Sequence, residues 1–448
     1  MEFHDILHGK IQFADEDELT KLLSDLIKSP EINRLRNMRQ MNFDVPLIQE
    51  LGRSRRLPHS VGVANLAYRL SKQDLLSIKD SKVLLAAAIM HDAAIPPYGH
   101  LVESEFKYDA SFNSRKVGPD PEHNIVYFNH EKSVEDLIKG SKVNDINKYT
   151  AIIPRKTPEV LDILRKHHVD VDNVISLICP PGGAKTPISA DIDLDNIDNV
   201  HRMAAMLGWD NARENFKKLV HSIHLNELAE MSFSHNAIPL VKQWLDFRER
   251  IYTMIIAHPE CVPYNALQAD LVREAVLSKI ITPKDWWLSE PVFEERLRSS
   301  SGTRVLADQL ISGCDYSLVD YIWIKNFKTT KKWHNAEIVR NLTENLPAHE
   351  DFGYFVWNEK GLISREINLL GRDGTREILG FNSTSCMIAY VKKTPGTPKW
   401  TNERKQKWRR DTLDQFIKMF ETSRFNVDCP EDYTGTFLAR KNNEFDFY

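Results

Sequence analysis

Two histidines and an aspartate stand where the surrounding pattern predicts apolar side chains. His59 lies on the apolar face of a helix that we expect over residues 57–71. His91 and Asp92 directly follow the uncharged run 83–90 (VLLAAAIM), which we expect to be a helix buried on every face. A buried imidazole or carboxylate is costly unless it is hydrogen-bonded, paired with a charge or bound to a metal. These three residues are therefore candidates for a buried polar site.

A further segment, ISADIDLDNIDNVHR (188–202), carries aspartates at helical spacing. If a helix spans 191–207, Asp191, Asp195 and Asp198 fall on one face, where like charges repel unless a cation lies among them. Two imidazoles and two carboxylates that meet in a helical core would compensate one another by binding a divalent metal. Mixed nitrogen and oxygen ligation suits Mn, Fe, Zn or Mg. The order His, His-Asp, Asp, each on a helix, therefore predicts a metal centre.

Five segments carry a resemblance to one enzyme superfamily: RLRNMRQM (34–41), RSRRLPHSVGVANLA (53–67), IMHDAAIPPYGHLVE (89–103), NHEKS (129–133) and DIDLDNIDNVHR (191–202). The chain resembles the HD phosphohydrolases, whose four metal ligands follow the order H…HD…D. More narrowly it resembles their dGTPase-like branch, the deoxynucleoside triphosphate triphosphohydrolases, because the PPYGHxxE element just after HD is specific to that branch. The resemblance covers about residues 30–330.

The resemblance implies a role for each matching residue. The implied metal ligands are His59, His91, Asp92 and Asp195. The implied active-site acid–base residues are His100, Glu103 and His130. The implied substrate contacts are Arg56 and Arg248 to phosphate and Gln40 to the sugar 3′-hydroxyl. The implied reaction converts a deoxynucleoside triphosphate (dNTP) and water into a deoxynucleoside and triphosphate.

These residue types suit that chemistry. A divalent metal polarises a phosphoryl group and lowers the pKa of water. A histidine held by a carboxylate can move a proton near neutral pH. Arginine binds phosphate through two parallel hydrogen bonds.

The chain departs from the family pattern at three positions. Asn196 stands where many members have lysine, and Asn199 and Ile256 stand where tyrosine is usual. These changes leave base and sugar selectivity open. Control by a nucleotide activator is also open, and a homo-oligomer is expected because this branch generally assembles into oligomers. Depletion of dNTPs by such enzymes resembles an antiviral strategy.

The organisation of the chain predicts a mainly α fold with an HD-type helical domain over residues 1–335 and an α+β region over 345–448. In the first domain, helices are expected over 17–28, 57–71, 83–90, 130–139, 158–168, 191–207, 211–230, 238–257, 265–279, 290–300 and 315–324. In the second region, strands are expected over 353–357, 362–370 and 386–393 and a helix over 401–421.

Composition excludes several classes of protein. Of the 448 residues, 42% are apolar and 27% charged, which suits a globular protein rather than a disordered one. Five scattered cysteines form no CxxC pair, and no apolar run could span a membrane, so we expect a cytoplasmic protein. The net charge of −4 gives no general attraction to nucleic acid.

Two alternative functions stay open at this stage. The altered sugar positions allow an HD phosphatase or phosphodiesterase acting on nucleoside monophosphates, cyclic nucleotides or short oligonucleotides. The basic, tryptophan-containing segment 392–410 allows a nucleotide- or nucleic-acid-binding regulator with a vestigial site, although a solvated amphipathic helix is the simpler interpretation.

Overall fold

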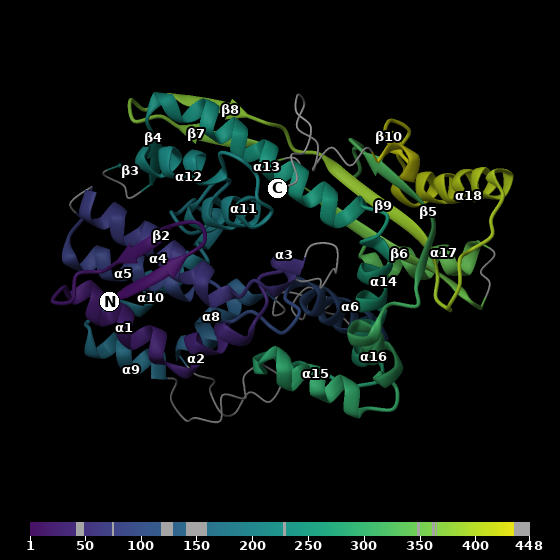
Figure 1. Cartoon of the computed structure of the whole chain (residues 1–448), viewed down its shortest axis with the longest axis horizontal. Coiled ribbons are helices and arrows are strands. Elements are labelled where there is room, and N and C mark those ends of the chain that lie inside the picture. Colours follow the sequence, from purple (N-terminus) through teal and green to yellow (C-terminus); the bar gives the residue numbers. More distant parts are fainter. Residues whose placement is uncertain are drawn as a thin grey trace, which may run out of the picture.

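The computed structural model shows a mainly helical molecule with a smaller sheet-containing region toward the C-terminus, which confirms the predicted fold class (Figure 1). It describes residues 1–41, 49–73, 76–117, 129–139, 159–226, 230–346, 350–360, 363 and 365–433. The aromatic end of the chain and residues 118–128 of the polar stretch after the PPYGHxxE element lie outside the described residues.

Helices supply most of the first 312 residues. The longer ones are α1 (Glu18–Lys28), α4 (Arg56–Gln73), α5 (Ile78–Met90), α6 (His100–Val117), α8 (His130–Lys139), α9 (Glu159–Lys166), α10 (Val171–Ile178), α11 (Leu194–Met206), α12 (Ala212–His221), α13 (Ile238–Ala257), α14 (Val262–Leu277), α15 (Glu290–Ser299) and α16 (Arg304–Ser312). The short helices α2 (Pro30–Asn33) and α3 (Gln49–Arg53) lie between α1 and α4.

Helix α5 is the centre of this bundle because almost its whole surface is apolar. Ser77 caps its N-terminus by accepting a hydrogen bond from the Asp80 backbone, and every residue from Val83 to Met90 is buried. The helix packs against α1, α4 and α10, so from Val83 onward no face is left to water, although its first turn is exposed. Its last turn therefore delivers His91 and Asp92 directly into the core.

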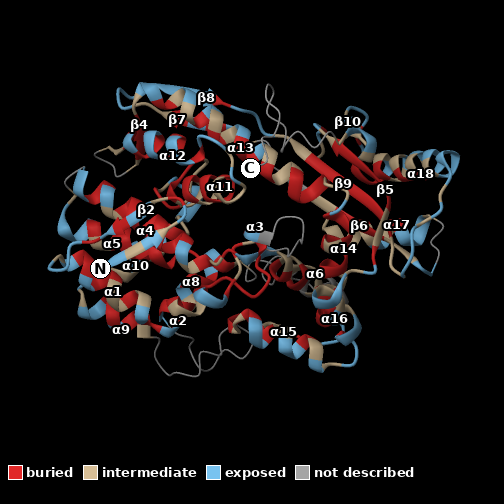
Figure 2. Cartoon of the chain, viewed as in Figure 1, coloured by how far each residue is buried: buried red, intermediate tan, exposed pale blue. Residues whose placement is uncertain are grey.

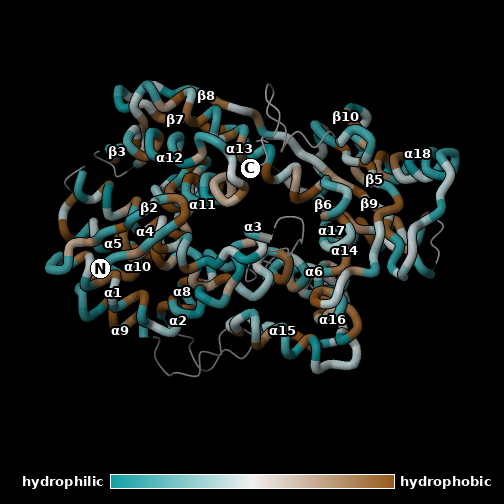
Figure 3. Tube along the Cα trace, in the orientation of Figure 1, coloured by the Kyte–Doolittle hydropathy of each residue, from teal (hydrophilic) through white to brown (hydrophobic). Residues whose placement is uncertain are grey.

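A four-stranded antiparallel sheet forms the second region, in the order β10–β5–β9–β6. Its strands are β5 (Ser317–Lys325), β6 (Phe352–Lys360), β9 (Thr384–Lys392) and β10 (Asn426–Asp428). One face packs against α17 (Asn335–Asn345) and α18 (Asn402–Phe420), and the other packs against α13 and α14 of the helical bundle. Both faces are buried, as the red central strands in Figure 2 and the apolar stretches of β5 and β9 in Figure 3 show.

Two predicted helices are wrong. The segment predicted as a helix over 315–324 is strand β5, whose run of β-branched and aromatic residues is buried on both faces of the sheet. The helix predicted over 211–230 ends at His221, and the chain continues as the hairpin of β3 (Ile223–Leu225) and β4 (Met231–Phe233).

Two hairpins were not anticipated as such. At the N-terminus, β1 (Glu2–Asp5) pairs with β2 (Gly9–Gln12). In the C-terminal half, β7 (Ile367–Leu370) pairs with β8 (Arg376–Leu379) and packs on the helical core beside β4 rather than joining the sheet (Figure 1). The division of the chain at 335–345 stays a prediction. Strand β5 precedes this division in the sequence but belongs to the sheet, and the β7–β8 hairpin follows it but packs on the helical bundle.

Among the described residues, no helix has the length and apolar character needed to cross a membrane.

Candidate metal centre

His59 lies between two aspartates of α11. Its Nε2 is 2.9 Å from Asp195 Oδ1, and its Nδ1 is 2.7 Å from Asp198 Oδ1. The ring is fully buried. Because Asp198 is shielded and paired with an arginine, Nδ1 is the nitrogen expected to carry the proton, which leaves the lone pair of Nε2 directed at Asp195.

His91 presents a second nitrogen to the same carboxylate. Its Nδ1 donates a hydrogen bond to the Ala88 carbonyl at 2.8 Å, one turn earlier in α5. Its buried Nε2 has no hydrogen-bond partner among the described residues and lies 3.5 Å from Asp195 Oδ1. Ligand atoms of His59, His91 and Asp195 all lie within 4.8 Å of one another, so three of the four predicted metal ligands converge.

Asp92, the fourth predicted ligand, lies at the edge of this group. Its Oδ2 accepts a hydrogen bond from Arg56 Nη1 at 2.7 Å and is 3.7 Å from His91 Nε2. Arg56 donates its other bonds to the carbonyls of Arg39 and Gln40, at 3.0 and 3.4 Å. The arginine predicted to bind phosphate thus ties Asp92 to the backbone of Arg39 and Gln40, and its phosphate contact stays a prediction.

Burial and pairing compete to set the charges of these groups. Burial would lower the pKa of His59, but its hydrogen bonds to Asp195 and Asp198 raise it above the ordinary value. Burial would raise the pKa of Asp195, but the hydrogen bonds and charges of His59 and His91 hold it well below its usual range. The cluster therefore needs positive charge next to Asp195, which either protons or a cation could supply.

The donor set fits a divalent metal. Two imidazole nitrogens with their second nitrogens fixed, together with a carboxylate oxygen, form a nitrogen–oxygen site of borderline hardness. The unpartnered Nε2 of His91 is the atom that a metal would satisfy.

A histidine–glutamate–histidine group lies beside the metal-type cluster. Glu103 accepts hydrogen bonds from His100 Nδ1 at 2.9 Å and from His130 Nδ1 at 2.7 Å. The His130 backbone N–H adds a third bond to Glu103, at 2.8 Å. Although burial alone would raise the pKa of Glu103, the two histidines lower it well below its usual range. His130 Nε2 lies 3.9 Å from Asp92 Oδ1, so this predicted acid–base group adjoins the predicted ligands.

An outer network that the sequence interpretation missed supports His59. Asp198 accepts hydrogen bonds from His8 Nε2 at 2.6 Å and from Arg202 Nε at 2.8 Å. Arg202 also reaches Asp5 at 2.6 Å, so the N-terminal hairpin is tied to α11. Only glycine fits at position 62, because a Cβ there would collide with the Asp198 and Arg202 side chains. The pairing of Asp198 with Arg202, four residues apart, was visible as helical spacing, but His8 gave no signal.

The start of α11 corrects the predicted row of aspartates. The helix begins at Leu194, with Asp193 as its N-cap, so Asp191 precedes it and pairs with Lys185 at the surface. Asp193 is buried, and its side chain accepts bonds from the backbone and side chain of Asn196. Only Asp195 and Asp198 therefore face the site from this helix.

The predicted substrate-binding residues Arg248 and Gln40 each carry one buried atom for which the described residues offer no hydrogen-bond partner. Arg248 on α13 is 2% exposed, and its Nε has no hydrogen-bond partner. The guanidinium carbon instead lies 4.8 Å from the ring centre of Tyr252. Gln40 donates to Asn199 Oδ1 at 3.3 Å, while its own Oε1 is buried without a partner. Ile256, the third departure from the family pattern, packs in the apolar core beneath the sheet.

An arginine outside the main cluster fixes the loop that follows His91-Asp92. Arg34 donates hydrogen bonds to the carbonyls of Ala93 at 3.1 Å and Leu288 at 3.2 Å, and to that of Ile95. The loop then turns through Tyr98 and Gly99, both in the left-handed region, before α6 begins at His100. This turn places His100 and Glu103 on the same side as Asp92.

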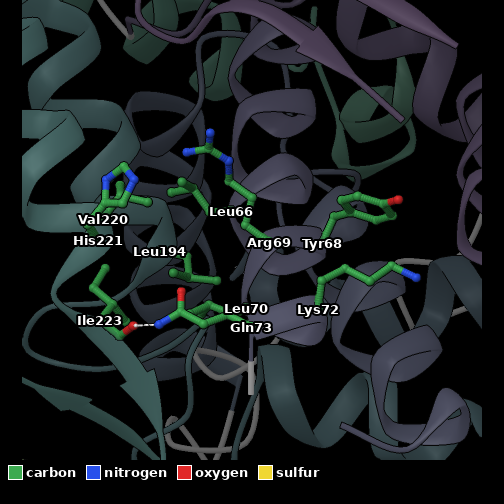
Figure 4. Close-up of a pocket in the computed structure, with 10 residues that line it drawn as sticks. All are labelled: Leu66, Tyr68, Arg69, Leu70, Lys72, Gln73, Leu194, Val220, His221 and Ile223. Atoms are coloured by element: carbon green, nitrogen blue, oxygen red, sulfur yellow. Dashed lines mark hydrogen bonds between the residues drawn. The ribbon is translucent and has the colours of Figure 1, made fainter. Parts of the chain in front are cut away.

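A pocket of about 410 Å³ lies apart from these groups, between α4 and α12 (Figure 4). Leu66, Leu70 and Val220 give it an apolar floor, and Gln73 is hydrogen-bonded to the Ile223 carbonyl at its edge. Leu194, which precedes Asp195, also lines it, so the pocket and the metal-type cluster lie on the two sides of the first turn of α11.

Comparison with known proteins finds one family model that matches part of the chain. Residues 56–203 match the family model described as the HD domain, a range that holds all the predicted ligands together with the His100, Glu103 and His130 group. HD domains bind divalent metals, and the converging donors lie within the matched range. Gln40 and Arg248 lie outside the matched range.

Curated relatives are distant. The uncharacterized protein MG461 of Mycoplasma genitalium is 24% identical over 259 residues, which cover 56% of this chain and 55% of the relative. Its homolog in Mycoplasma pneumoniae is 22% identical over the same shares. The uncharacterized protein YwfO of Bacillus subtilis is 23% identical over 264 residues, covering 57% of this chain and 52% of the relative. The chain thus spans about half the length of these relatives.

Proposed function

We propose that the protein hydrolyses deoxynucleoside triphosphates to deoxynucleoside and triphosphate with a divalent metal. The observation that carries this proposal is the buried Arg248, whose Nε has no hydrogen-bond partner among the described residues and which lies in the electrostatic field of Asp193 and Asp195 without forming an ion pair with either. A buried N–H donor of a charged group is costly to leave unused, and this favours an anionic ligand next to the metal-type donors.

The residues present suit the proposed step. A cation held by His59, His91 and Asp195, with Asp92 beside them, would polarise the α-phosphoryl group and lower the pKa of the attacking water. The water oxygen forms a bond to the α-phosphorus, the bond from that phosphorus to the sugar O5′ breaks, and a proton must reach O5′. His100 can deliver that proton from Nε2, because its Nδ1 is held by Glu103 and its side chain is 62% exposed toward incoming substrate.

Gln40 supplies the proposed contact to the sugar. The orphan Oε1 of Gln40 is an acceptor suited to a sugar hydroxyl, and the resemblance to dGTPase-like enzymes assigns it the 3′-hydroxyl. Asn199 holds the amide nitrogen of the same side chain. The sugar contact would thus come from a glutamine oriented by an asparagine.

Product analysis tests the proposal. Purified protein is incubated with each dNTP and with Mn or Mg, and the products are separated by ion-exchange chromatography. Deoxynucleoside with intact triphosphate is expected. Inorganic phosphate or nucleoside monophosphate would instead identify a phosphatase or phosphodiesterase. If single dNTPs stay intact, equimolar mixtures test whether a second nucleotide is needed as activator, and lack of turnover there would overturn the proposal.

A further inference from the structure

Arg365 enters the site from the C-terminal half of the chain. It precedes β7, whose hairpin packs on the helical bundle rather than on the sheet. Its Nη1 donates hydrogen bonds to the Asp191 carbonyl and to Asn196 Oδ1, both at 3.1 Å. Asn196 directly follows the predicted ligand Asp195, so an arginine 170 positions away in sequence reaches the rim of the metal-type cluster.

The position of Arg365 is held from two sides. The Asn196 amide nitrogen donates to both carboxylate oxygens of Asp193, at 2.8 and 2.9 Å, which turns its oxygen toward Arg365. Behind the arginine, Gly380 sits at φ +71°, and a Cβ there would collide with the Arg365 carbonyl oxygen. The backbone at Arg365 is therefore packed closely against the end of β8.

The charge of Arg365 is not neutralised by the protein. Within the described part of the chain, both acceptors of its hydrogen bonds are neutral oxygens and no carboxylate pairs with it. Only Nη1 is used, which leaves the Nε–H and Nη2 donors for a ligand.

Arg248 is the second positive charge at this place. Burial lowers the pKa of Arg248, the nearby Tyr252, Asp193 and Asp195 raise it, and the positive charge of Arg365 lowers it. Two arginines of like charge, one of them buried with an Nε that has no hydrogen-bond partner among the described residues, would be stabilised by an anion that contacts both. A polyanion can contact both arginines at once, so the pair suits a ligand of this kind.

We propose that Arg365 joins Arg248, whose phosphate contact the family resemblance already implies, in binding the phosphates beyond the α-phosphoryl group of the substrate, and so favours triphosphates over monophosphates. This inference rests on the proposed function for the identity of the substrate, but its test needs no turnover. Each arginine offers two parallel N–H donors that match phosphate oxygens. Arg365 would thus make residues outside the HD-domain match part of the substrate site.

Binding of inorganic tripolyphosphate and of orthophosphate to the full-length, Mn-loaded protein tests the proposal by titration calorimetry. Arg365→Gln should weaken tripolyphosphate binding by about 10- to 100-fold and leave orthophosphate binding within about twofold. Arg365→Lys keeps the charge but not the two-donor geometry and should fall between Gln and wild type. The matched control is Arg372→Gln, an exposed arginine at the turn of the same hairpin, which should bind tripolyphosphate like wild type.

The binding measurements test the role of Arg365 independently of whether the protein hydrolyses dNTPs. Equal tripolyphosphate binding by wild type and Arg365→Gln, or equal loss for tripolyphosphate and orthophosphate, would overturn it, as would a wild-type protein that binds no tripolyphosphate. If wild type binds tripolyphosphate through Arg365 but does not hydrolyse dNTPs, the inference stands and the proposed reaction fails. Unchanged circular dichroism and melting temperature ensure that each variant is folded.

Discussion

The helical bundle and the sheet region both bury aspartates, but they compensate them in different ways. In the sheet region, the fully buried Asp320 accepts two bonds from Arg409, both at 2.8 Å, and a third from the Tyr321 backbone at 2.9 Å. In the bundle, Asp195 faces two histidines, and neither His91 Nε2 nor Arg248 Nε has a hydrogen-bond partner within the part of the chain that the structure describes. One aspartate is satisfied by the protein, whereas the other belongs to a group that a ligand would complete.

This difference separates structural charge from functional charge. The sheet region also has buried side-chain atoms without a hydrogen-bond partner among the described residues, such as Thr412 Oγ1, but these are uncharged and cost far less than an unpaired ionic group. A matched buried pair such as Asp320–Arg409 can fix one packing arrangement without needing a ligand. Changes in the sheet region should therefore affect stability, and changes in the bundle cluster should affect binding and rate.

Loss of Asp195 should have the largest effect. Asp195→Ala removes the carboxylate shared by His59 and His91 and should lower the rate of dNTP hydrolysis at least ~10³-fold and abolish stoichiometric Mn binding. Metal content by mass spectrometry after dialysis, and turnover by product chromatography, measure both effects. The control is Asp191→Ala, at the surface just before α11, which should bind Mn and hydrolyse dNTPs like wild type. Full turnover by Asp195→Ala would show that the cluster is not the catalytic centre.

Breaking the sheet-region pair should reduce stability without changing catalysis. Arg409→Met leaves Asp320 buried without its bidentate partner and should lower the free energy of unfolding by about 3 kcal/mol in urea titrations. The control is Arg404→Met on the same helix, an exposed arginine stacked 4.2 Å from the ring centre of Trp400, which should cost less than about 1 kcal/mol. A lower rate of dNTP hydrolysis per folded molecule of Arg409→Met would contradict the assignment of a purely structural role to the Asp320–Arg409 pair.

Weakening the support of His59 should give a smaller effect on the metal. Asp198→Asn keeps the shape but removes the charge that fixes the His59 Nδ1 proton, so Mn affinity should fall about 10- to 100-fold. His8→Gln removes only one partner of Asp198 and should cost less. Competition with a fluorescent chelator measures both affinities. If the two variants bind Mn like wild type, the network serves packing alone.

The contact between the two regions should depend on pH. His334 donates toward Ser104 of α6, 2.7 Å away. Its pKa falls from 6.5 to about 4, mainly because the side chain is buried. The negative charge of Glu337 raises the pKa, and the positive charges of Arg273 and Lys107 lower it. The unfolded chain thus takes up a proton near pH 6.5 that the folded chain excludes until about pH 4, so stability falls as the pH is lowered through this interval.

We expect a loss of about 1–2 kcal/mol between pH 7 and 4.5 from this histidine, allowing for its partial exposure. Urea unfolding at several pH values should show a shallower pH dependence in His334→Gln than in wild type. His4→Gln, at an exposed position, is the control. If the free energy of unfolding changes with pH equally in wild type and His334→Gln, His334 is not the source of the pH dependence.

Several predictions depended only on local sequence, and these hold. The 3.6-residue pattern located α1, α4, α8, α13 and α18, and the uncharged run before His91 located α5, because buried faces repeat with the period of the helix. Where the local signal was ambiguous the prediction failed: the run SLVDYIWIK has almost no polar face, so periodicity alone cannot distinguish a buried strand from a buried helix.

The sequence by itself determined which residues could form the site: His59, His91, Asp92 and Asp195 all come from local pattern and from resemblance to HD enzymes. Only the tertiary structure decided what surrounds them. His8 lies 190 positions from Asp198, and Arg365 lies 169 from Asn196, so no local pattern links either pair. The physical reason is that burial cost selects polar residue types along the chain, whereas charge compensation depends on which distant elements pack together.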